Sequence, residues 1–215
     1  WSLSTRPEPG MDLNYSMIYI DFVQRFSDWR KTPWAAYFSH YEPSSEYRKY
    51  WWSTADSPVK YKTITAVQYA ADLHGAIVQV TPPIDKQFEI RQMPKNKKKL
   101  AGVSGFIDRL SGRKGERMVS FIASDLADEA DFVASGEGWP LRTINHDFAG
   151  LCNFYNSLDL YVCASSIEGI PMPPLEALRC GIPVIIPRGV GILDELPSIP
   201  GITRWQPGEG QQASL

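Results

Sequence analysis

The chain has 215 residues, 43% of them hydrophobic, which is enough to bury a core in one large domain or in two smaller lobes. Its formal charge is −2 at pH 7. This balance excludes the overall basic charge with which many proteins bind nucleic acid or anionic membranes, so any basic site must be local.

The cysteines and the apolar runs bear on the compartment. Cys152, Cys163 and Cys180 lack the paired spacing of zinc ligands or of a disulfide framework. No apolar run approaches the ~20 residues that span a bilayer, and residues 1–7 carry no signal-peptide core. We therefore expect a cytoplasmic protein without a transmembrane segment.

Strand and helix patterns alternate in the first part of the chain. Residues 17–23 form a short apolar run that fits a strand or a buried helix equally well. The pattern then predicts strands at 34–39, 61–67 and 76–80 and helices at 44–55 and 68–73. Such alternation is typical of a parallel α/β sheet.

The apolar pattern stops before a lysine-rich run, residues 94–99, which read Pro-Lys-Asn-Lys-Lys-Lys. This run predicts a solvated connection between two lobes, and the alternative is an anchor for an anionic acceptor. We place the domain boundary here, with a short acceptor-side lobe at residues 1–95 and a second lobe at residues 96–215.

The second lobe alternates more clearly. The pattern predicts strands at 100–105, 131–135, 160–164 and 183–187 and helices at 116–123, 146–157, 173–179 and near Leu193. Glycine or proline lies at most of the turns, so we predict a doubly wound, Rossmann-like domain.

Residues 165–185 form the densest motif of the chain. A glycine-containing loop follows a strand, Pro173 and Pro174 open a helix, and Gly181 ends that helix. A helix N-terminus reached in this way offers backbone N–H groups and a positive dipole end, which suit a diphosphate. Glu168 and Glu176 can accept hydrogen bonds from sugar and ribose hydroxyls. An ordinary turn with surface acids is the alternative.

This motif resembles that of the retaining GT-B glycosyltransferases (glycosyltransferase group 1, family 4-like), whose two glutamates are separated by seven residues. The matching positions are Glu168, Gly169, Glu176, Ala177, Gly181, Pro183, Val184 and Ile185. The resemblance implies that Glu176 holds the ribose and that Glu168 contacts the transferred sugar. It also places Gly169, Ile170 and Pro171 at the donor, the first two through their backbone N–H groups.

Two segments upstream, residues 103–106 and 113–116, look like the first strand-to-helix turn of that family. The resemblance implies that Gly105 lies at the donor and that Lys114 neutralises the departing diphosphate. Arg113 or Arg109 is the second cation, and the choice stays open because Phe106 stands where the family usually has arginine. A solvated helix start is the alternative interpretation.

Two further elements complete the expected site. Gly136 lies in a segment similar to the family's glycine turn near the nucleotide, although a turn without ligand contact fits as well. His40 ends a predicted strand, where open α/β sheets place ligands, and resembles the histidine that faces the donor. A hydrogen-bonded structural role is its alternative, and His74 and His146 are predicted to be solvated helix ends.

The resemblance implies a GT-B-like α/β fold of two Rossmann-like lobes with parallel sheets, the first lobe reduced. It implies a hexosyltransferase that moves a sugar from a UDP- or GDP-linked donor to an acceptor hydroxyl with retention. His40, Glu168 and Lys114 are the catalytic candidates. No Asp-x-Asp motif or His/Cys cluster is present, so we expect no metal and no cofactor.

Two alternatives remain. The small size and the lysine-rich run suggest a phage-type enzyme that glycosylates a hydroxymethylated DNA base, an analogy of fold only. The short first lobe and Phe106 suggest a non-catalytic module that binds sugar nucleotides. The acceptor (glycan, small molecule or modified DNA) stays open.

Overall fold

The computed structural model describes residues 14–16, 34–38, 61–64, 76–80, 83–94, 96–107, 112–198 and 200–206. The chain forms two compact units. The first comprises Trp1–Pro82 with Glu168–Ile170, and the second comprises Pro83–Ile167 with Pro171–Leu215. Residues 17–23 and the helices predicted at 44–55 and 68–73 lie outside the described residues.

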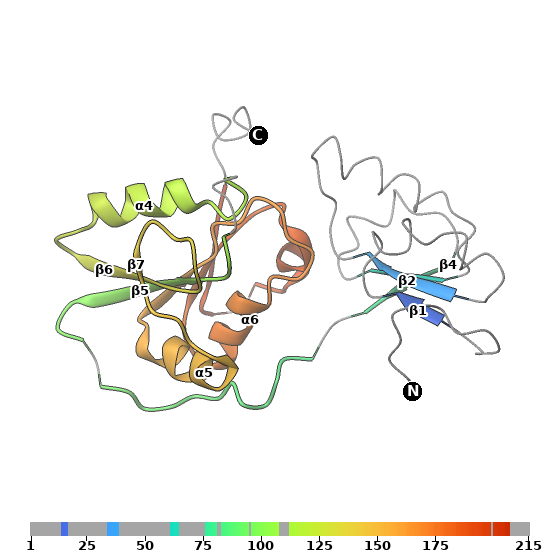
Figure 1. Ribbon diagram of the computed structural model, residues 1–215, viewed down its shortest axis with the longest axis horizontal. Coiled ribbons are helices and arrows are strands. Elements are labelled where there is room, and N and C mark those ends of the chain that lie inside the picture. The colour runs from blue at the N-terminus through green and yellow to red at the C-terminus, as the bar shows by residue number, and fades with distance from the viewer. Residues whose placement is uncertain are drawn as a thin grey trace. The chain divides into compact units, whose positions relative to one another are not determined.

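The described part of the first unit is a four-stranded parallel sheet in the order β1-β2-β3-β4 (Figure 1). Its strands are β1 (Asn14–Ser16), β2 (Trp34–Phe38), β3 (Tyr61–Ile64) and β4 (Ala76–Gln79). Ala35 and Ala36, whose side chains point to opposite faces of β2, are both buried. The strands predicted for this part of the chain are confirmed, and β1 is an addition.

The second unit contains a six-stranded parallel sheet in the order β10-β9-β8-β5-β6-β7. Its strands are β5 (Lys99–Ser104), β6 (Ala130–Ser135), β7 (Arg142–Thr143), β8 (Leu160–Val162), β9 (Val184–Pro187) and β10 (Ile202–Trp205). Its helices are α4 (Glu116–Asp125), α5 (Phe148–Ser157), α6 (Met172–Arg179) and the 3-10 helix η2 (Gly191–Glu195). Helix α4 covers one face, and α5 and α6 cover the other (Figure 1). The predicted doubly wound domain is confirmed.

The order of the strands reverses beside β5. The chain runs outward from β5 through β6 to β7, then returns to β8 on the other side of β5 and continues to β9 and β10. The loops after β5 and β8 therefore lead to opposite faces of the sheet. They diverge at the carboxyl ends of these two neighbouring strands. Ligands of open α/β sheets bind at such a switch point.

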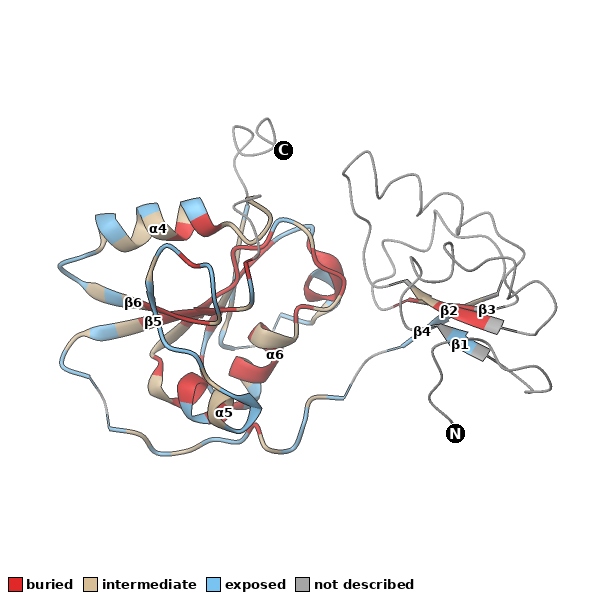
Figure 2. Ribbon diagram, in the orientation of Figure 1, coloured by how far each residue is buried: buried red, intermediate tan, exposed pale blue. Residues whose placement is uncertain are grey.

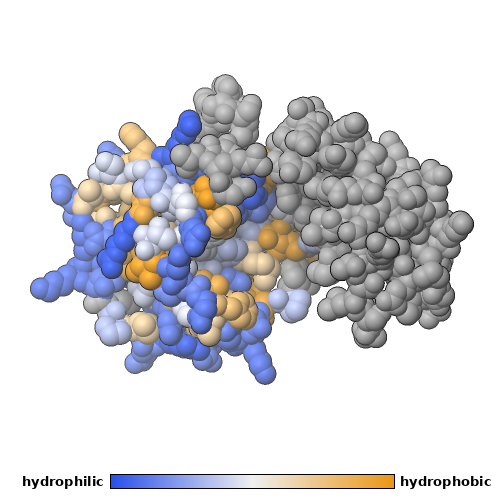
Figure 3. All heavy atoms as spheres, viewed as in Figure 1, coloured by the Kyte–Doolittle hydropathy of each residue, from blue (hydrophilic) through white to orange (hydrophobic). Residues whose placement is uncertain are grey.

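The core of the second unit lies along the central strands, where the buried residues gather in Figure 2. One continuous cluster joins Val103, Ile107, Val119, Ala134, Trp139, Val162 and Ala164. Hydrophilic residues cover much of the visible face of this unit, and hydrophobic residues show there in small separate groups (Figure 3). Burial of the central strands thus fixes the positions from which the loops at their ends begin.

The extended segment before β5 packs on the second unit. Phe88 is 1% exposed, and its carbonyl accepts a hydrogen bond from Arg179 Nε at 2.8 Å. The Arg91 N–H donates to Asn156 Oδ1 at 2.7 Å. The boundary expected between residues 95 and 96 consequently lies inside the second unit, which begins at Pro83.

The turns after β5 and β6 meet backbone to backbone. Gly136 has a φ of +112°, and a Cβ atom added there would lie 2.3 Å from the Gly105 carbonyl oxygen. The Gly105 N–H donates to the Ser135 carbonyl at 2.9 Å, so neither backbone can withdraw. A glycine at position 136 is therefore required by both its conformation and its contact.

We expect Gly136→Ala to lower the free energy of unfolding by about 3 kcal/mol or more, because the added methyl meets backbone that cannot move. Gly189→Ala is the matched control, because Gly189 has a φ of +77° but no atom within 4 Å of an added Cβ. That variant should lose about 1–2 kcal/mol, from backbone strain alone. Urea unfolding followed by tryptophan fluorescence measures both, and equal losses would contradict the contact argument.

Candidate functional site

The carboxyl end of β5 carries the first part of the site. Gly105 has a φ of +119°, and its carbonyl accepts a hydrogen bond from the Trp139 indole at 2.8 Å. A Cβ atom at Gly105 would lie 3.8 Å from both Cε and Nζ of Lys114. Lys114 thus extends its amine over the Gly105 turn, with Gly136 packed beneath, and the structure brings these three predicted residues together.

The loop that carries Lys114 is joined to the loop after β8. The Ser166 N–H and hydroxyl donate to the Arg113 carbonyl at 2.8 and 3.3 Å, and Arg113 Nη1 donates to the Ile167 carbonyl at 3.4 Å. A Cβ atom at Gly115 would lie 2.3 Å from the Ala164 carbonyl oxygen. The cationic loop therefore lies directly against the residues that precede Glu168.

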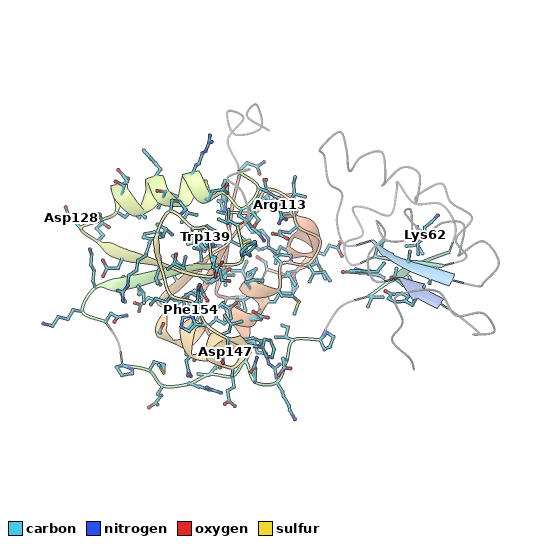
Figure 4. All side chains as sticks on the ribbon, in the orientation of Figure 1. Lys62, Arg113, Asp128, Trp139, Asp147 and Phe154 are labelled. Carbon is cyan, nitrogen blue, oxygen red and sulfur yellow. The ribbon has the colours of Figure 1, made fainter. Side chains whose placement is uncertain are left out.

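The Arg113 guanidinium makes the bond to the Ile167 carbonyl. Arg113 precedes α4, and Asp128 lies beyond the other end of that helix (Figure 4). The bond to Ile167 occupies one of the five N–H donors of the group. The other candidate for the second cation, Arg109, lies outside the described residues, as does the catalytic candidate His40.

The loop into α6 offers fewer donors than its helix N-terminus suggests. Pro171 is the N-cap of α6, and Pro173 and Pro174 are the second and third residues of the helix. None of these prolines has an N–H group. The backbone donors of this turn are accordingly Gly169, Ile170 and Met172, and no hydrogen bond within the described part of the chain uses them.

Met172 was missed by the sequence interpretation. The prolines around it are the signal that could have identified it, because Met172 is the one residue of 171–174 that retains an N–H group. Pro171, by contrast, can contribute shape to a donor site but no backbone N–H.

Glu176 is held by a buried tyrosine. The side chain is 8% exposed, and Oε2 accepts a hydrogen bond from the Tyr155 hydroxyl at 2.7 Å. Burial raises the pKa of Glu176 above its usual value, and the bond from Tyr155 partly opposes this shift. Among the described residues Tyr155 is the hydrogen-bond partner of Glu176, so Oε1 can accept from a ligand hydroxyl.

Ser104 extends the hydrogen-bonded network of Glu176 and Tyr155. Its hydroxyl lies 2.9 Å from the Tyr161 hydroxyl and 3.5 Å from the Tyr155 hydroxyl. Burial raises the pKa of both tyrosines, which therefore stay protonated at neutral pH. Tyr155 is thus a permanent donor to Glu176, a role that the sequence interpretation did not assign.

His146 differs from its predicted state. Its Nδ1 lies 3.1 Å from the Ser135 hydroxyl, and its ring packs on Phe154 with centroids 5.1 Å apart. His146 lies at the start of α5, as predicted, but it is half-buried, because the turn before α5 folds this ring back onto the carboxyl end of β6.

The described residues also bear on redox, metal and membrane roles. Cys152, Cys163 and Cys180 are buried and are not joined in disulfides. The described ranges contain no group of three or more His, Cys, Asp or Glu side chains that could hold a metal ion. Within the same ranges, the helices fall short of the length and apolar character needed to cross a membrane.

The lysine-rich run lies at the other end of the sheet. Lys98 pairs with Asp131 at 3.1 Å and also donates to the Ala127 carbonyl, and Lys99 pairs with Asp159 at 3.4 Å. These contacts lie at the amino ends of β5 and β6, whereas Lys114 and Glu176 follow the carboxyl ends of β5 and β8. Two lysines of the run are therefore partly neutralised and remote from the site within this unit.

Comparison with known families gives a match over part of the second unit. Residues 145–196 match the family described as glycosyl transferases group 1. The matched segment contains α5, β8 and α6, and with them Tyr155, Glu168 and Glu176. No curated protein sequence matches the chain.

Solved structures with the same fold cover nearly the whole chain. Sucrose-phosphate synthase from Thermosynechococcus elongatus aligns with 95% of this chain and 63% of its own, at 15% identity and a TM-score of 0.73. Anabaena HepE, in complex with UDP-glucose, aligns over 94% and 67% at 13% identity and a TM-score of 0.72. The starch synthase IV catalytic domain from Arabidopsis thaliana aligns over 94% and 64% at 11% identity and a TM-score of 0.57.

These alignments establish the fold class. The chain has the parallel-sheet, Rossmann-like α/β fold of GT-B glycosyltransferases, as the sequence predicted. It spans less than two thirds of the length of the sucrose-phosphate synthase structure.

We expect Glu176→Gln to change the pH dependence of stability. The pKa of Glu176 is raised in the folded state, so the wild type loses stability as pH rises from the usual carboxyl value of 4.5 through the raised pKa. Glutamine keeps an acceptor for Tyr155 and does not ionise. The free energy of unfolding of the wild type, relative to that of the variant, should therefore fall as pH rises from 4.5 through the raised pKa of Glu176. Above that pKa the difference should become constant.

Urea unfolding of both proteins between about pH 4 and about pH 8 tests this expectation. A difference in unfolding free energy that is constant with pH would contradict it. So would a difference that moves in favour of the wild type as pH rises.

Proposed function

We propose that the loops that follow β5 and β8 bind a nucleoside diphosphate sugar and that the protein transfers the sugar to an acceptor hydroxyl with retention at the anomeric carbon. One observation carries this proposal. The loops at the β5–β8 switch point hold Lys114, three backbone N–H groups without a hydrogen bond among the described residues, and the Glu176 side chain bonded to Tyr155, all at the same end of the sheet.

Each group has a role that its chemistry supports. Lys114 and the N–H groups of Gly169, Ile170 and Met172 would bind the diphosphate and stabilise the charge that develops on it as the sugar leaves. Glu176 Oε1 would accept from a ribose hydroxyl, and Glu168 would orient the sugar. Because these charges come from the protein, the proposed reaction needs no metal ion.

The remaining assignments belong to the same proposal. His40 is the proposed catalytic residue of the first lobe, and the reaction would take place in the cytoplasm. A uridine diphosphate donor is supported by Anabaena HepE, which is known in complexes with UDP-glucose and with UDP. Starch synthase IV is known bound to ADP, so the base is a matter for measurement.

The arrangement of charge favours a glycan or small-molecule acceptor over DNA. A DNA acceptor was suggested by the lysine-rich run, yet Lys98 and Lys99 pair with carboxylates at the far end of the sheet from Lys114. Binding of DNA through phosphate contacts would need these cations to be available.

We expect the wild type to bind UDP in calorimetric titrations and Lys114→Ala to weaken that binding by about tenfold or more, since a charge-assisted contact is lost. Binding of uridine, which lacks phosphates, should be unchanged in this variant. Glu176→Ala should weaken the binding of both UDP and uridine, because both contain the ribose. Lys99→Ala is the control with the same charge change at the other end of the sheet, and it should bind both ligands as the wild type does.

Failure of the wild type to bind UDP, GDP or ADP would refute the proposed donor site. Turnover separates the enzyme from a non-catalytic binding module: an enzyme releases UDP from UDP-glucose, slowly by hydrolysis or faster with an acceptor. Tight binding without release in any acceptor mixture would refute transfer while leaving the donor site in place.

A further inference from the structure

The first residue of α4 is a buried acid that none of the roles above uses. Glu116 is 0% exposed. Its Oε1 accepts a hydrogen bond from the Gly112 N–H at 2.7 Å. Its Oε2 is buried and lacks a hydrogen-bond partner within the described part of the chain. A buried carboxylate with one unsatisfied oxygen costs free energy, so its presence calls for an explanation other than stability.

The position of this acid provides one. Glu116 and Gly112 flank the turn that contains Arg113 and Lys114, so the 2.7 Å bond closes the turn into a ring. A second bond inside the ring runs from the Gly115 N–H to the Gly112 carbonyl at 2.9 Å. Gly112 and Gly115 both have positive φ, at 81° and 69°. The backbone on each side of Lys114 is therefore tied down.

This closure fixes the position from which the Lys114 side chain begins. The Lys114 stem has four rotatable bonds and would lose much freedom on binding a phosphate. A fixed turn keeps the start of the stem in one place, and the Gly105 turn accommodates its end, with Cε and Nζ each 3.8 Å from the position of an added Cβ. A negative charge at the first position of α4 is also compatible with the positive end of that helix.

We propose that Glu116 is a positioning residue for the donor diphosphate. Its Oε1 holds the 112–116 turn closed, and the closed turn presents Lys114 over Gly105 ready to bind phosphate. The role is that of a hydrogen-bond acceptor acting through Lys114, without contact between Glu116 and the donor. This inference rests on the proposed function, because it takes the diphosphate as the ligand of Lys114.

Two substitutions separate the acceptor from the side-chain volume. Glu116→Gln keeps an oxygen for the Gly112 N–H, whereas Glu116→Met fills a similar volume without a strong acceptor. Calorimetry with UDP and with uridine compares these variants with the wild type, with Lys114→Ala and with the Glu116→Met/Lys114→Ala double variant. Melting temperatures and amide hydrogen exchange at Gly112 show whether each variant is folded and whether its turn is closed.

We expect Glu116→Met to weaken UDP binding by about tenfold and to expose the Gly112 amide to exchange, with uridine binding unchanged. Glu116→Gln should restore UDP affinity to within about threefold of the wild type. In the Lys114→Ala background, Glu116→Met should have no further effect, because its path to the phosphate is already gone.

Four results would overturn the inference while leaving the donor site intact, and the first three concern Glu116→Met. One is a UDP affinity of Glu116→Met equal to that of the wild type. Another is a loss of UDP affinity in the double variant that equals the sum of the two single losses. The third is a loss of uridine affinity in Glu116→Met as large as its loss of UDP affinity, which would indicate general destabilisation. A loss in Glu116→Gln as large as that in Glu116→Met would likewise exclude the acceptor role. A wild type that binds no nucleoside diphosphate would refute the proposed function, and this inference with it.

Discussion

The reversal of strand order between β5 and β8 is the constraint on which the site depends. Two neighbouring strands whose loops lead to opposite faces leave their carboxyl ends accessible. Here those two loops are also pressed together, because Gly115 leaves no room for a side chain against the Ala164 carbonyl and Ser166 donates twice to the Arg113 carbonyl. The lysine of one loop and the motif of the other therefore have a fixed relation.

The second unit accepts buried polar groups around this edge. Glu176 and Glu116 are both acids with little or no exposure, and burial raises the pKa of Glu176. Among the described residues each is bound on one oxygen, Glu176 by the Tyr155 hydroxyl and Glu116 by the Gly112 N–H. An apolar residue at either position would avoid the desolvation cost. Retaining an incompletely satisfied buried group is typical of sites that are arranged for a ligand and not for stability.

Much of this could be predicted from the sequence, because local patterns carry it. The alternation of apolar runs with glycine and proline predicted β5, β6, β8 and β9 and the helices α4, α5, α6 and η2 of the second unit. The short edge strands β7 and β10 were not predicted, because the exposed residues of β7 and the partly exposed residues of β10 form no apolar run. The Glu168 and Glu176 motif was identifiable because its residues are close in sequence.

Contacts between distant positions could not be predicted in this way. Tyr155 and Glu176 are 21 residues apart, and only the packing of α5 beside α6 makes them partners. The packing of Phe88 and Arg91 on the second unit is likewise a tertiary fact, since the segment itself has no periodic pattern. A solvated helix start was the alternative interpretation of residues 113–116, and the complete burial of Glu116 there is a tertiary feature that the local pattern does not show.

The second phosphate cation shows how the fold and the chemistry fit together. Phe106 occupies the position where an arginine was expected and is 62% exposed, and Arg113 spends one donor on the Ile167 carbonyl. In the proposed donor complex, the backbone N–H groups of residues 169, 170 and 172 would supply the electrostatic contribution of a second cation. Such donors are fixed by the fold and lose no side-chain entropy on binding. A single lysine is then sufficient, provided that its turn is held closed, and that is the condition that Glu116 meets.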